Sequence, residues 1–251
     1  MDLSGKVCVI TGAASGIGRA AAIRFRREGA EGLVLGDLDF KKIETTPDGV
    51  AVPCDVAKEA DVQQLVREAE KRHGRVDVFF SNAGIFQAGD IRAPDADWER
   101  NWKIHVMAHV YAARAVVDGM VARGGGYFIV TASAAGLLNI VESASYGVTK
   151  HGAVAIAEWL AIAYGRKGVK VSCLCPQAVL TNMFTGDGGS AGVDGALTVE
   201  QAMDELVKTM REEKFLVLPH PRVLDYMRVK TGDYDRWLGG MQKLFLKHAG
   251  R

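Results

Sequence analysis

An excess of charge of either sign and long apolar segments are both missing from this sequence. Its 251 residues include 31 lysines and arginines and 30 aspartates and glutamates, which leaves a net charge of +1. Nucleic-acid-binding domains usually carry a basic patch, so this balance predicts no nucleic-acid partner. A membrane-spanning helix needs about 18 or more consecutive apolar residues, and no run approaches that length. We therefore expect no membrane span.

Cysteine is scarce as well, and its positions argue against disulfides. Cys8, Cys54, Cys173 and Cys175 lie within or at the end of strand-like apolar runs. The spacing of Cys173 and Cys175 puts them on the same side of a strand, where they are wrongly directed for a disulfide. Buried, reduced thiols are typical of cytosolic proteins. The first residues also lack the apolar segment of a signal peptide, so we expect a cytoplasmic protein.

Short apolar runs alternate with amphipathic stretches along the chain. We expect strands at 7–11, 33–35, 50–53, 76–80, 127–131, 169–174 and 215–218. We expect helices at 18–28, 40–45, 59–73, 98–121 and 146–164, and one or two helices at 223–248. Strands that are apolar on both faces and separated by helices indicate a parallel sheet covered on both sides.

This pattern predicts an α/β fold with a single Rossmann-type domain over residues 1–251. We expect a doubly wound parallel sheet of about seven strands in the order 3-2-1-4-5-6-7, with helices on both faces and a nucleotide at its C-terminal edge. Five glycines among residues 185–195 predict a loop, part of a substrate loop at about 178–200. A helical extension follows at about 220–251.

A glycine-rich turn connects the first expected strand to the first expected helix. It places Gly12, Gly16 and Gly18 around the start of the helix, together with Ser15 and Ile17. Glycines permit a tight turn and the close approach of a pyrophosphate, and the N–H groups of the helix start supply donors and a positive dipole. A glycine triplet alone can be a simple strand–helix turn, but here the flanking strand and helix agree with a phosphate site.

An acidic residue follows the second expected strand, at the position that distinguishes NAD from NADP in dinucleotide-binding folds. Asp37 lies 19 residues after Gly18. A carboxylate there can accept a hydrogen bond from a ribose 2′-hydroxyl and repel a 2′-phosphate. No basic residue follows directly, so NAD is favoured over NADP. The neighbouring Leu38 is expected to contact the cofactor, and Asp39 is either a stand-in for Asp37 or a solvated loop acid.

Further motifs occur in a fixed order along the chain. They are Cys54-Asp55-Val56, Asn82-Ala83-Gly84, Ser133, the pair Tyr146 and Lys150 four residues apart, and the stretch Pro176 to Thr181. With the glycine spacing G-x-x-x-G-x-G, this set resembles the short-chain dehydrogenase/reductase family from about residue 4 to about residue 184.

The resemblance implies further cofactor contacts and an assembly. Asp55 and Val56 resemble the family's acidic turn under the adenine, and Asn82, Ala83 and Gly84 the segment that lines the nicotinamide ribose. Pro176, Val179 and Thr181 lie in the stretch that contacts the carboxamide, and Tyr146 and Lys150 also contact the cofactor. The family further implies a homodimer or homotetramer, with the helices at 98–121 and 146–164 in the interface.

The residue types also explain the chemistry. Tyr146 and Lys150 share a helix face, and a phenol has an ordinary pKa of about 10, too high for a base at neutral pH. An adjacent ammonium and the positive nicotinamide of NAD+ favour the phenolate and lower that pKa. Tyr146 then takes the alcohol proton as hydride leaves, and Ser133 holds the substrate oxygen near the phenol. Lys150 has a second role on the ribose hydroxyls.

Two positions depart from the family pattern. His105 stands where the family has a catalytic asparagine, which supports a helix distortion whose free main-chain carbonyl holds a water linking the lysine to solvent. A histidine there can alter this proton relay or its pH dependence, so His105→Asn is expected to retain or raise activity and to shift the pH–rate profile. Gln177 replaces the family's glycine after Pro176, and the sequence does not predict its effect on the nicotinamide contact.

His105 and His109 also lie four residues apart, which is the spacing of two metal ligands on one helix face. The run lacks the glutamate of a His-Glu-x-x-His motif, and no third ligand is evident. We therefore expect no metal site, and a packed or interface role for His109.

These motifs together predict an enzyme, a short-chain NAD(H)-dependent oxidoreductase that interconverts a secondary alcohol and a ketone. We expect an apolar small-molecule substrate in contact with Leu137, Asn139, Met183 and Phe184. The apolar stripe of the C-terminal extension is expected either to pack against the body or a second subunit or to cover the substrate pocket. Two alternatives stay open: an NADPH-dependent carbonyl reductase, and a nucleotide-binding protein with weak or no turnover.

Overall fold

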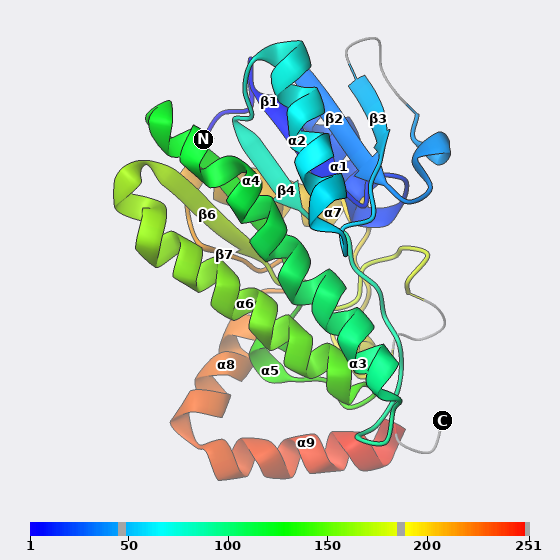
Figure 1. Ribbon diagram of the computed structural model, residues 1–251. Coiled ribbons are helices and arrows are strands. Elements are labelled where there is room, and N and C mark those ends of the chain that lie inside the picture. The colour runs from blue at the N-terminus through cyan, green and yellow to red at the C-terminus, as the bar shows by residue number, and fades with distance from the viewer. Residues whose placement is uncertain (45–48, 185–188, 249–251) are drawn as a thin grey trace.

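The computed structural model describes residues 1–44, 49–184 and 189–248 and contains a seven-stranded parallel sheet (Figure 1). The strands are β1 Val7–Thr11, β2 Gly32–Asp37, β3 Gly49–Pro53, β4 Val78–Ser81, β5 Gly126–Thr131, β6 Val169–Leu174 and β7 Leu216–Val217. Their order in the sheet is β3-β2-β1-β4-β5-β6-β7. The predicted doubly wound topology and strand order are confirmed.

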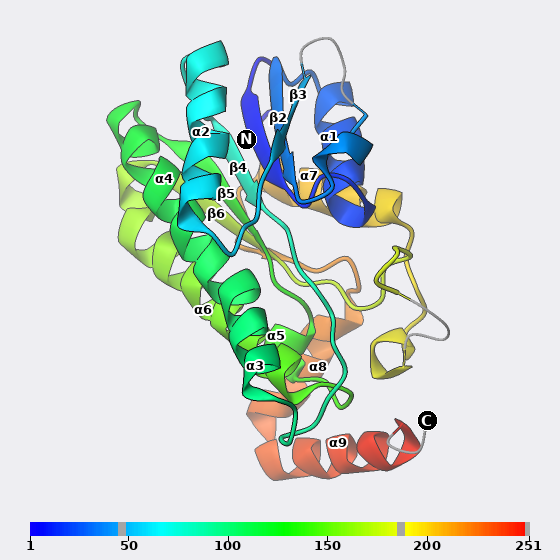
Figure 2. The same ribbon diagram turned by 45° about the vertical axis from the view of Figure 1, so that its right-hand side comes forward.

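Helices cover both faces of the sheet. They are α1 Gly16–Arg27, α2 Glu59–His73, α3 Asp95–Trp102, α4 Ala108–Ala122, α5 Ala135–Leu138, α6 Ala144–Tyr164, α7 Val199–Glu212, α8 Arg222–Gly232 and α9 Tyr234–His248. Figure 2 shows α1 and α7 on one face and α2, α4 and α6 on the other. Among the described residues, no helix is long and apolar enough to cross a bilayer.

The alternation of side chains along each strand divides the core in two. In β1, Val7 and Val9 belong to the cluster under α2, α4 and α6, whereas Cys8 and Ile10 belong to the cluster under α1 and α7. Successive side chains of a strand point to opposite faces, so a strand that is apolar throughout supplies both cores. Each side chain of this size contributes about 2 kcal/mol when it is fully buried.

The strand order reverses between β1 and β4, and polar contacts hold the two strand ends there. The side-chain Nδ2 of Asn82 donates to the Thr11 carbonyl at 3.0 Å, and the Thr131 hydroxyl donates to Asn82 Oδ1 at 2.9 Å. These contacts tie together the C-terminal ends of β1, β4 and β5. In open α/β sheets, ligands bind outside this reversal point.

Two expected helices differ in the structure. The stretch 98–121 is not one regular helix, because a π-helix at Lys103–Met107 separates α3 from α4. Of the helix expected at 40–45, the described residues 40–44 contain a single 3-10 turn, Phe40–Lys42, and residue 45 lies outside the described residues. The spacing of hydrophobic residues does not reveal either change. The α-helix, the π-helix and the 3-10 helix differ in the carbonyl to which each backbone N–H donates, and hydrophobic spacing does not determine that partner.

The C-terminal extension forms a layer of its own beyond the sheet. Val223 of α8 is fully buried in a small third cluster with Ala134 and Leu138 of the segment around α5. In Figure 1, α9 lies below α3 and α5, away from the strands. No residue of α9 is fully buried, and its inward side chains, which include Trp237 and Met241, are partly exposed.

Candidate active site

A cavity of about 520 Å³ lies at the C-terminal edge of the sheet. It receives residues from the glycine-rich turn, the ends of β2, β4 and β5, the start of α6 and the segment after β6. Its lining contains these residues predicted from the sequence: Gly12, Ser15, Gly16, Ile17, Asp37, Leu38, Asp55, Val56, Asn82, Ala83, Gly84, Ser133, Tyr146, Lys150, Pro176, Val179, Thr181, Met183 and Phe184. Gly18, His105, Leu137 and Asn139 do not line it.

The glycine-rich turn has the geometry of a phosphate cradle. Gly12 and Gly16 adopt φ values of +69° and +53°, in the region that favours glycine. A Cβ on Gly12 would lie 2.9 Å from the Ala83 Cα. A Cβ on Gly18 would lie 2.1 Å from the Gly12 carbonyl oxygen, so Gly18 serves the packing of α1 against the turn instead of lining the cavity. Ser15 is the N-cap residue of α1, yet its side chain makes no capping hydrogen bond.

Asp37 is held rigidly at the end of β2. Its Oδ2 accepts a hydrogen bond from the Ala14 N–H at 2.9 Å, and its Oδ1 accepts one from the Asp39 N–H at 2.9 Å. A carboxylate has lone pairs for about four hydrogen bonds, so it can still accept hydroxyl groups. Asp39 forms an ion pair with Lys42 at 2.7 Å and does not line the cavity, which favours a solvated loop acid over a stand-in for Asp37.

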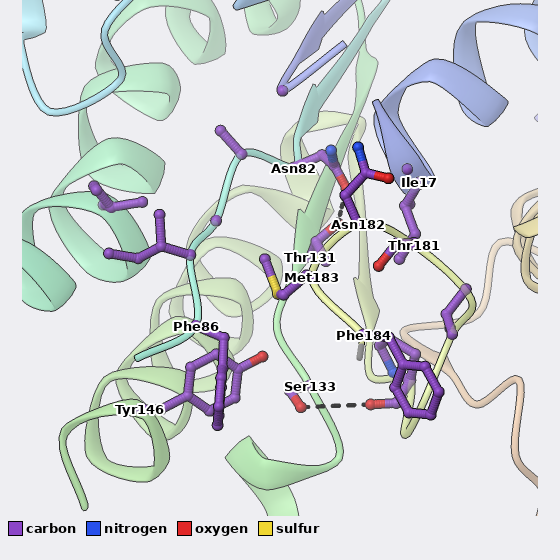
Figure 3. Close-up of a pocket in the computed structure, with 18 of the residues that line it drawn as sticks. Ile17, Asn82, Phe86, Thr131, Ser133, Tyr146, Thr181, Asn182, Met183 and Phe184 are labelled. Carbon is purple, nitrogen blue, oxygen red and sulfur yellow. Dashed lines mark hydrogen bonds between the residues drawn. The ribbon is translucent and has the colours of Figure 1, made fainter. Parts of the chain in front are cut away.

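Ser133 and Tyr146 line the same cavity as Asp37. Ser133 follows β5, and its hydroxyl oxygen accepts a hydrogen bond from the Ala135 N–H at 3.1 Å and lies 3.4 Å from the Pro176 carbonyl (Figure 3). Burial raises the pKa of Tyr146, and a hydrogen bond with Ser133 opposes that increase. In the protein alone the pKa of Tyr146 is therefore raised. The lowering of this pKa predicted from the sequence applies to the complex with a positively charged nicotinamide.

Lys150 lies one helical turn beyond Tyr146 and is buried. Its Nζ donates to the Thr131 carbonyl at 2.9 Å and lies 5.6 Å from the centre of the Tyr146 ring. Burial lowers the pKa of Lys150 to about 8, because the charged form loses solvation. A Cβ on Gly84 would lie 3.6 Å from this Nζ, so the glycine leaves the space in front of the ammonium open.

His105 lies behind this pair, inside the π-helix, and is fully buried. Its Nε2 accepts a hydrogen bond from the Ile85 N–H at 3.1 Å, so the ring hydrogen is on Nδ1, which donates to the Thr149 hydroxyl at 2.9 Å. Burial and the charge of Lys150 hold the pKa of His105 well below its ordinary value. The helix distortion of the family is present here, but both ring nitrogens are engaged and the neutral ring has no atom left for a proton relay.

His109 has a separate environment from His105. It is buried, and its Nδ1 lies 2.7 Å from the Ser81 hydroxyl. Burial lowers the pKa of His109 to about 3. Among the residues that the structure describes, no group of three or more histidine, cysteine, aspartate or glutamate side chains is arranged to hold a metal ion.

The substrate end of the cavity differs in part from the sequence-based expectation. Met183 and Phe184 line it, and Phe86 packs edge-on against Tyr146 with ring centres 5.2 Å apart (Figure 3). Leu137 instead packs beside the small cluster that includes Val223 of the C-terminal extension. Asn139 has φ +72° and its Oδ1 accepts from the Ile140 N–H at 2.9 Å, so it shapes the turn before α6.

Several lining residues were not among the site residues predicted from the sequence, although Cys54, Gln177 and Ala178 lie in the motifs noted above. They are Cys54, Ile85, Phe86, Ile104, Thr131, Ala132, Ile140, Glu142, Gln177, Ala178, Asn182, Gly189 and Ala191. Phe86 and Ile140 carry a usable signal, since they are apolar residues within a few positions of Gly84 and Tyr146 in the sequence. Glu142 carries none, because its partner Ser190 is 48 residues away, and their hydroxyl–carboxylate distance is 2.6 Å.

The parallel sheet, the glycine cradle and the Ser133–Tyr146–Lys150 group together define a nucleotide-binding oxidoreductase with a Rossmann fold. A model of the short chain dehydrogenase family matches residues 6–188 of the chain. The chain belongs to the short-chain dehydrogenase/reductase family.

Known relatives agree with this assignment over most of their length. The chain is 34% identical over 212 residues to the (21S)-21-acetoxyl-apo-melianone synthase SDR of Melia azedarach, covering 81% of this chain and 76% of the relative. It is 31% identical over 233 residues to the mitochondrial borneol dehydrogenase of Lavandula x intermedia, covering 89% and 90%. A short-chain dehydrogenase/reductase from Burkholderia phymatum, solved in complex with NAD, has a TM-score of 0.86 and 27% identity, over 94% and 96% of the two chains.

Proposed function

We propose that this protein is an NAD(H)-dependent dehydrogenase that interconverts an apolar secondary alcohol and its ketone. The observation that carries the proposal is the convergence of Ser133, Tyr146 and Lys150 on one cavity that continues to Asp37. The borneol dehydrogenase that the chain resembles acts, by its name, on an apolar secondary alcohol. The aromatic and sulfur-containing wall formed by Phe86, Met183 and Phe184 supports a substrate of that kind.

A dinucleotide fits the residues of the cavity. Gly12 and Gly16 form a tight turn in which a Cβ would meet Ala83 or Thr181, and the first N–H groups of α1, which no Ser15 side chain caps, are donors for a phosphate. Asp37 would hold the adenosine ribose through its hydroxyls, which favours NAD over NADP. When bound, the nicotinamide supplies the acceptor or donor of hydride.

The side chains of the protein then position the substrate and transfer its proton. Ser133 donates a hydrogen bond to the substrate oxygen and keeps it close to the Tyr146 phenol. In alcohol oxidation, Tyr146 acts as the general base and takes the hydroxyl proton, and in ketone reduction it returns that proton. The ammonium of Lys150 favours the phenolate form of Tyr146 because opposite charges attract across a buried, poorly screened space.

A panel of apolar secondary alcohols with NAD+ tests the proposal, with reduced nicotinamide measured by absorbance. We expect turnover by the wild type and a loss of about 100-fold or more in kcat for Tyr146→Phe, because the general base is removed while the ring remains. Tyr164→Phe is the matched control, since Tyr164 lies at the far end of α6 beside Trp159. Unchanged turnover in Tyr146→Phe would exclude the mechanism.

We also propose that two or four copies of the chain assemble through α4 and α6. Trp159 and Ile162 of α6 are 58% and 81% exposed, which is unusual for large apolar side chains on one helix. Sedimentation velocity of the wild type and of Ile162→Glu checks this assembly, and a monomeric wild type excludes it.

All four cysteines are buried free thiols, which is consistent with a reducing, cytoplasmic location.

A further inference from the structure

Glu142 lies in the wall of the cavity, four residues before Tyr146 in the sequence. The main chain around it is bonded to the loop that follows β4, because the Gly89 N–H donates to the Glu142 carbonyl at 3.0 Å. The next residue, Ser143, is the N-cap of α6, and its hydroxyl donates to the Gln87 carbonyl at 2.7 Å. The base of the Glu142 side chain therefore has a fixed position beside the start of α6.

The carboxylate of Glu142 reaches a segment that is distant in the sequence. Its Oε1 accepts a hydrogen bond from the Ser190 N–H at 2.6 Å, and its Oε2 accepts one from the Ser190 hydroxyl, also at 2.6 Å. Hydrogen bonds to an ionised carboxylate are shorter and about twice as strong as those between neutral groups. Ser190 is only 8% exposed, so solvent screens these bonds weakly. This pair of hydrogen bonds is the Glu142–Ser190 contact.

The residues on either side of Ser190 belong to the cavity wall. Gly189 and Ala191 both line the cavity. Gly189 has φ +54°, in the region that favours glycine, and a Cβ there would lie 2.5 Å from Glu142 Oε1. The Glu142–Ser190 contact therefore fixes the start of the 3-10 turn Gly189–Gly192 as a part of that wall. Figure 2 shows this turn, in yellow, set apart from the sheet.

Other contacts hold the end of the same segment. The Ala178 N–H, beyond β6, donates to the Ala191 carbonyl at 3.2 Å. The Tyr226 hydroxyl of α8 donates to the Asp194 carboxylate at 3.0 Å. These two contacts do not involve Glu142. Loss of the Glu142–Ser190 contact is therefore expected to loosen the start of the turn while its end stays in place.

We infer that Glu142 is a positioning residue for substrate binding: it holds residues 189–191 against the cavity before the substrate arrives. The inference rests on the proposed function and adds to it a side chain outside the group that carries out the chemistry. A wall that is already in place spares the substrate the entropic cost of ordering it. The Glu142–Ser190 contact should therefore act on substrate binding and leave the chemical step of Ser133, Tyr146 and Lys150 unchanged.

Steady-state kinetics separates binding from chemistry. Oxidation of borneol, cyclohexanol and 1-phenylethanol by saturating NAD+ is measured with the wild type and with Glu142→Ala. For each alcohol that is turned over, we expect KM to rise about tenfold in the variant and kcat to stay within about threefold. An unchanged KM, or a larger fall in kcat, overturns the inference. Glu205→Ala is the control, since Glu205 pairs with Lys208 at 3.1 Å and does not line the cavity.

Three further variants test the hydrogen bonds themselves. Glu142→Gln keeps an acceptor for the Ser190 N–H and a polar group for its hydroxyl, so its KM is expected to lie within about threefold of the wild-type value. Ser190→Ala should raise KM when Glu142 is present and have no further effect in the double variant with Glu142→Ala, because its partner is then absent. Additive effects in the double variant, or a Glu142→Gln variant as impaired as Glu142→Ala, overturn the inference.

Hydrogen exchange of the ligand-free protein tests the positioning without any turnover. Peptides that cover residues 189–195 are expected to exchange about tenfold faster in Glu142→Ala, because the Ser190 N–H loses its acceptor, whereas peptides of β1 and β5 keep their wild-type rates. Unchanged exchange at 189–195 overturns the inference, and so does an equal increase in the strands, which reports global unfolding. If the wild type turns over no alcohol or ketone at all, the proposed function fails by itself, and exchange alone decides the inference.

Discussion

The ammonium nitrogen of Lys150 donates a hydrogen bond to the main-chain carbonyl of Thr131, 2.9 Å away in the interior. The hydroxyl of the same threonine donates to Asn82 at 2.9 Å, so one residue at the end of β5 links the buried charge to the end of β4. This contact fixes the ammonium 5.6 Å from the Tyr146 ring centre. The sheet edge thus positions the charge that, in the proposed mechanism, favours the phenolate of Tyr146.

Removing that charge is expected to change the pH dependence of alcohol oxidation. In Lys150→Met, the phenolate of Tyr146 loses its nearby positive charge while burial still raises its pKa. The rise of kcat with pH should move to more alkaline pH by about one unit or more, with a loss of about 100-fold at neutral pH. Rate profiles from pH 6 to 10 measure this, with the exposed Lys208→Met as control. A variant with the wild-type profile would show that Lys150 does not act on the phenol.

Asp37 is expected to set the choice of cofactor. The wild type should use NAD+ in preference to NADP+, and Asp37→Ser should reduce the ratio of the two kcat/KM values by about 10- to 100-fold, because a charge-assisted hydrogen bond is lost and a repulsive charge is removed. Asp39→Ser is the matched control, since Asp39 pairs with Lys42 outside the cavity. Tighter binding of NADPH by the wild type would contradict this role and favour the NADPH-dependent reductase.

The buried histidines predict acid destabilisation. His105 and His109 have folded-state pKa values below the ordinary 6.5, that of His109 at about 3, so below pH 6.5 the unfolded chain binds protons that the folded chain does not. Stability therefore falls as the pH decreases through 6.5, and the two groups together account for a loss of about 3 kcal/mol between pH 7.5 and 5.5. Urea denaturation at several pH values measures the slope.

The variant His109→Leu separates the contribution of His109 to this pH dependence of stability from that of His105. His109→Leu should show about half of this pH-dependent loss, whatever its absolute stability, while His151→Leu on the partly exposed side of α6 should keep it. An equal slope in His109→Leu and the wild type would mean that other groups, such as carboxylates, produce the acid sensitivity.

The hydrogen bonds of His105 change what we expect of His105→Asn. The sequence alone predicts a shifted pH–rate profile, because a histidine can titrate near neutral pH. In the structure the ring is neutral and bonded at both nitrogens, to Ile85 and to Thr149. We now expect His105→Asn to keep kcat within about threefold and to leave the profile above pH 6 unchanged. A shift of either limb above pH 6 would restore a proton-relay role.

Local features of the sequence were sufficient for the fold and for the reacting group. The apolar runs of the strands predict the sheet because every second side chain enters each core, as in β1. Tyr146 and Lys150 share a face because four residues make about one helical turn. Gly12 and Gly16 indicate a tight turn in the sequence, because such a turn needs a positive φ that residues other than glycine rarely adopt. Both glycines have a positive φ in the structure.

Only the tertiary structure decided which distant residues meet. Leu137 and Asn139 are close to Tyr146 in sequence, yet they face the C-terminal extension and a local turn, because the short helix α5 directs them away from the cavity. Gln177 and His220 are 43 residues apart and share a hydrogen bond of 3.2 Å. No periodicity relates such pairs, since contact between them depends on how β6, β7 and α8 pack. The residues proposed to bind the nucleotide and to transfer the proton were therefore predictable from the sequence, whereas the residues that line the other end of the cavity depend on tertiary packing.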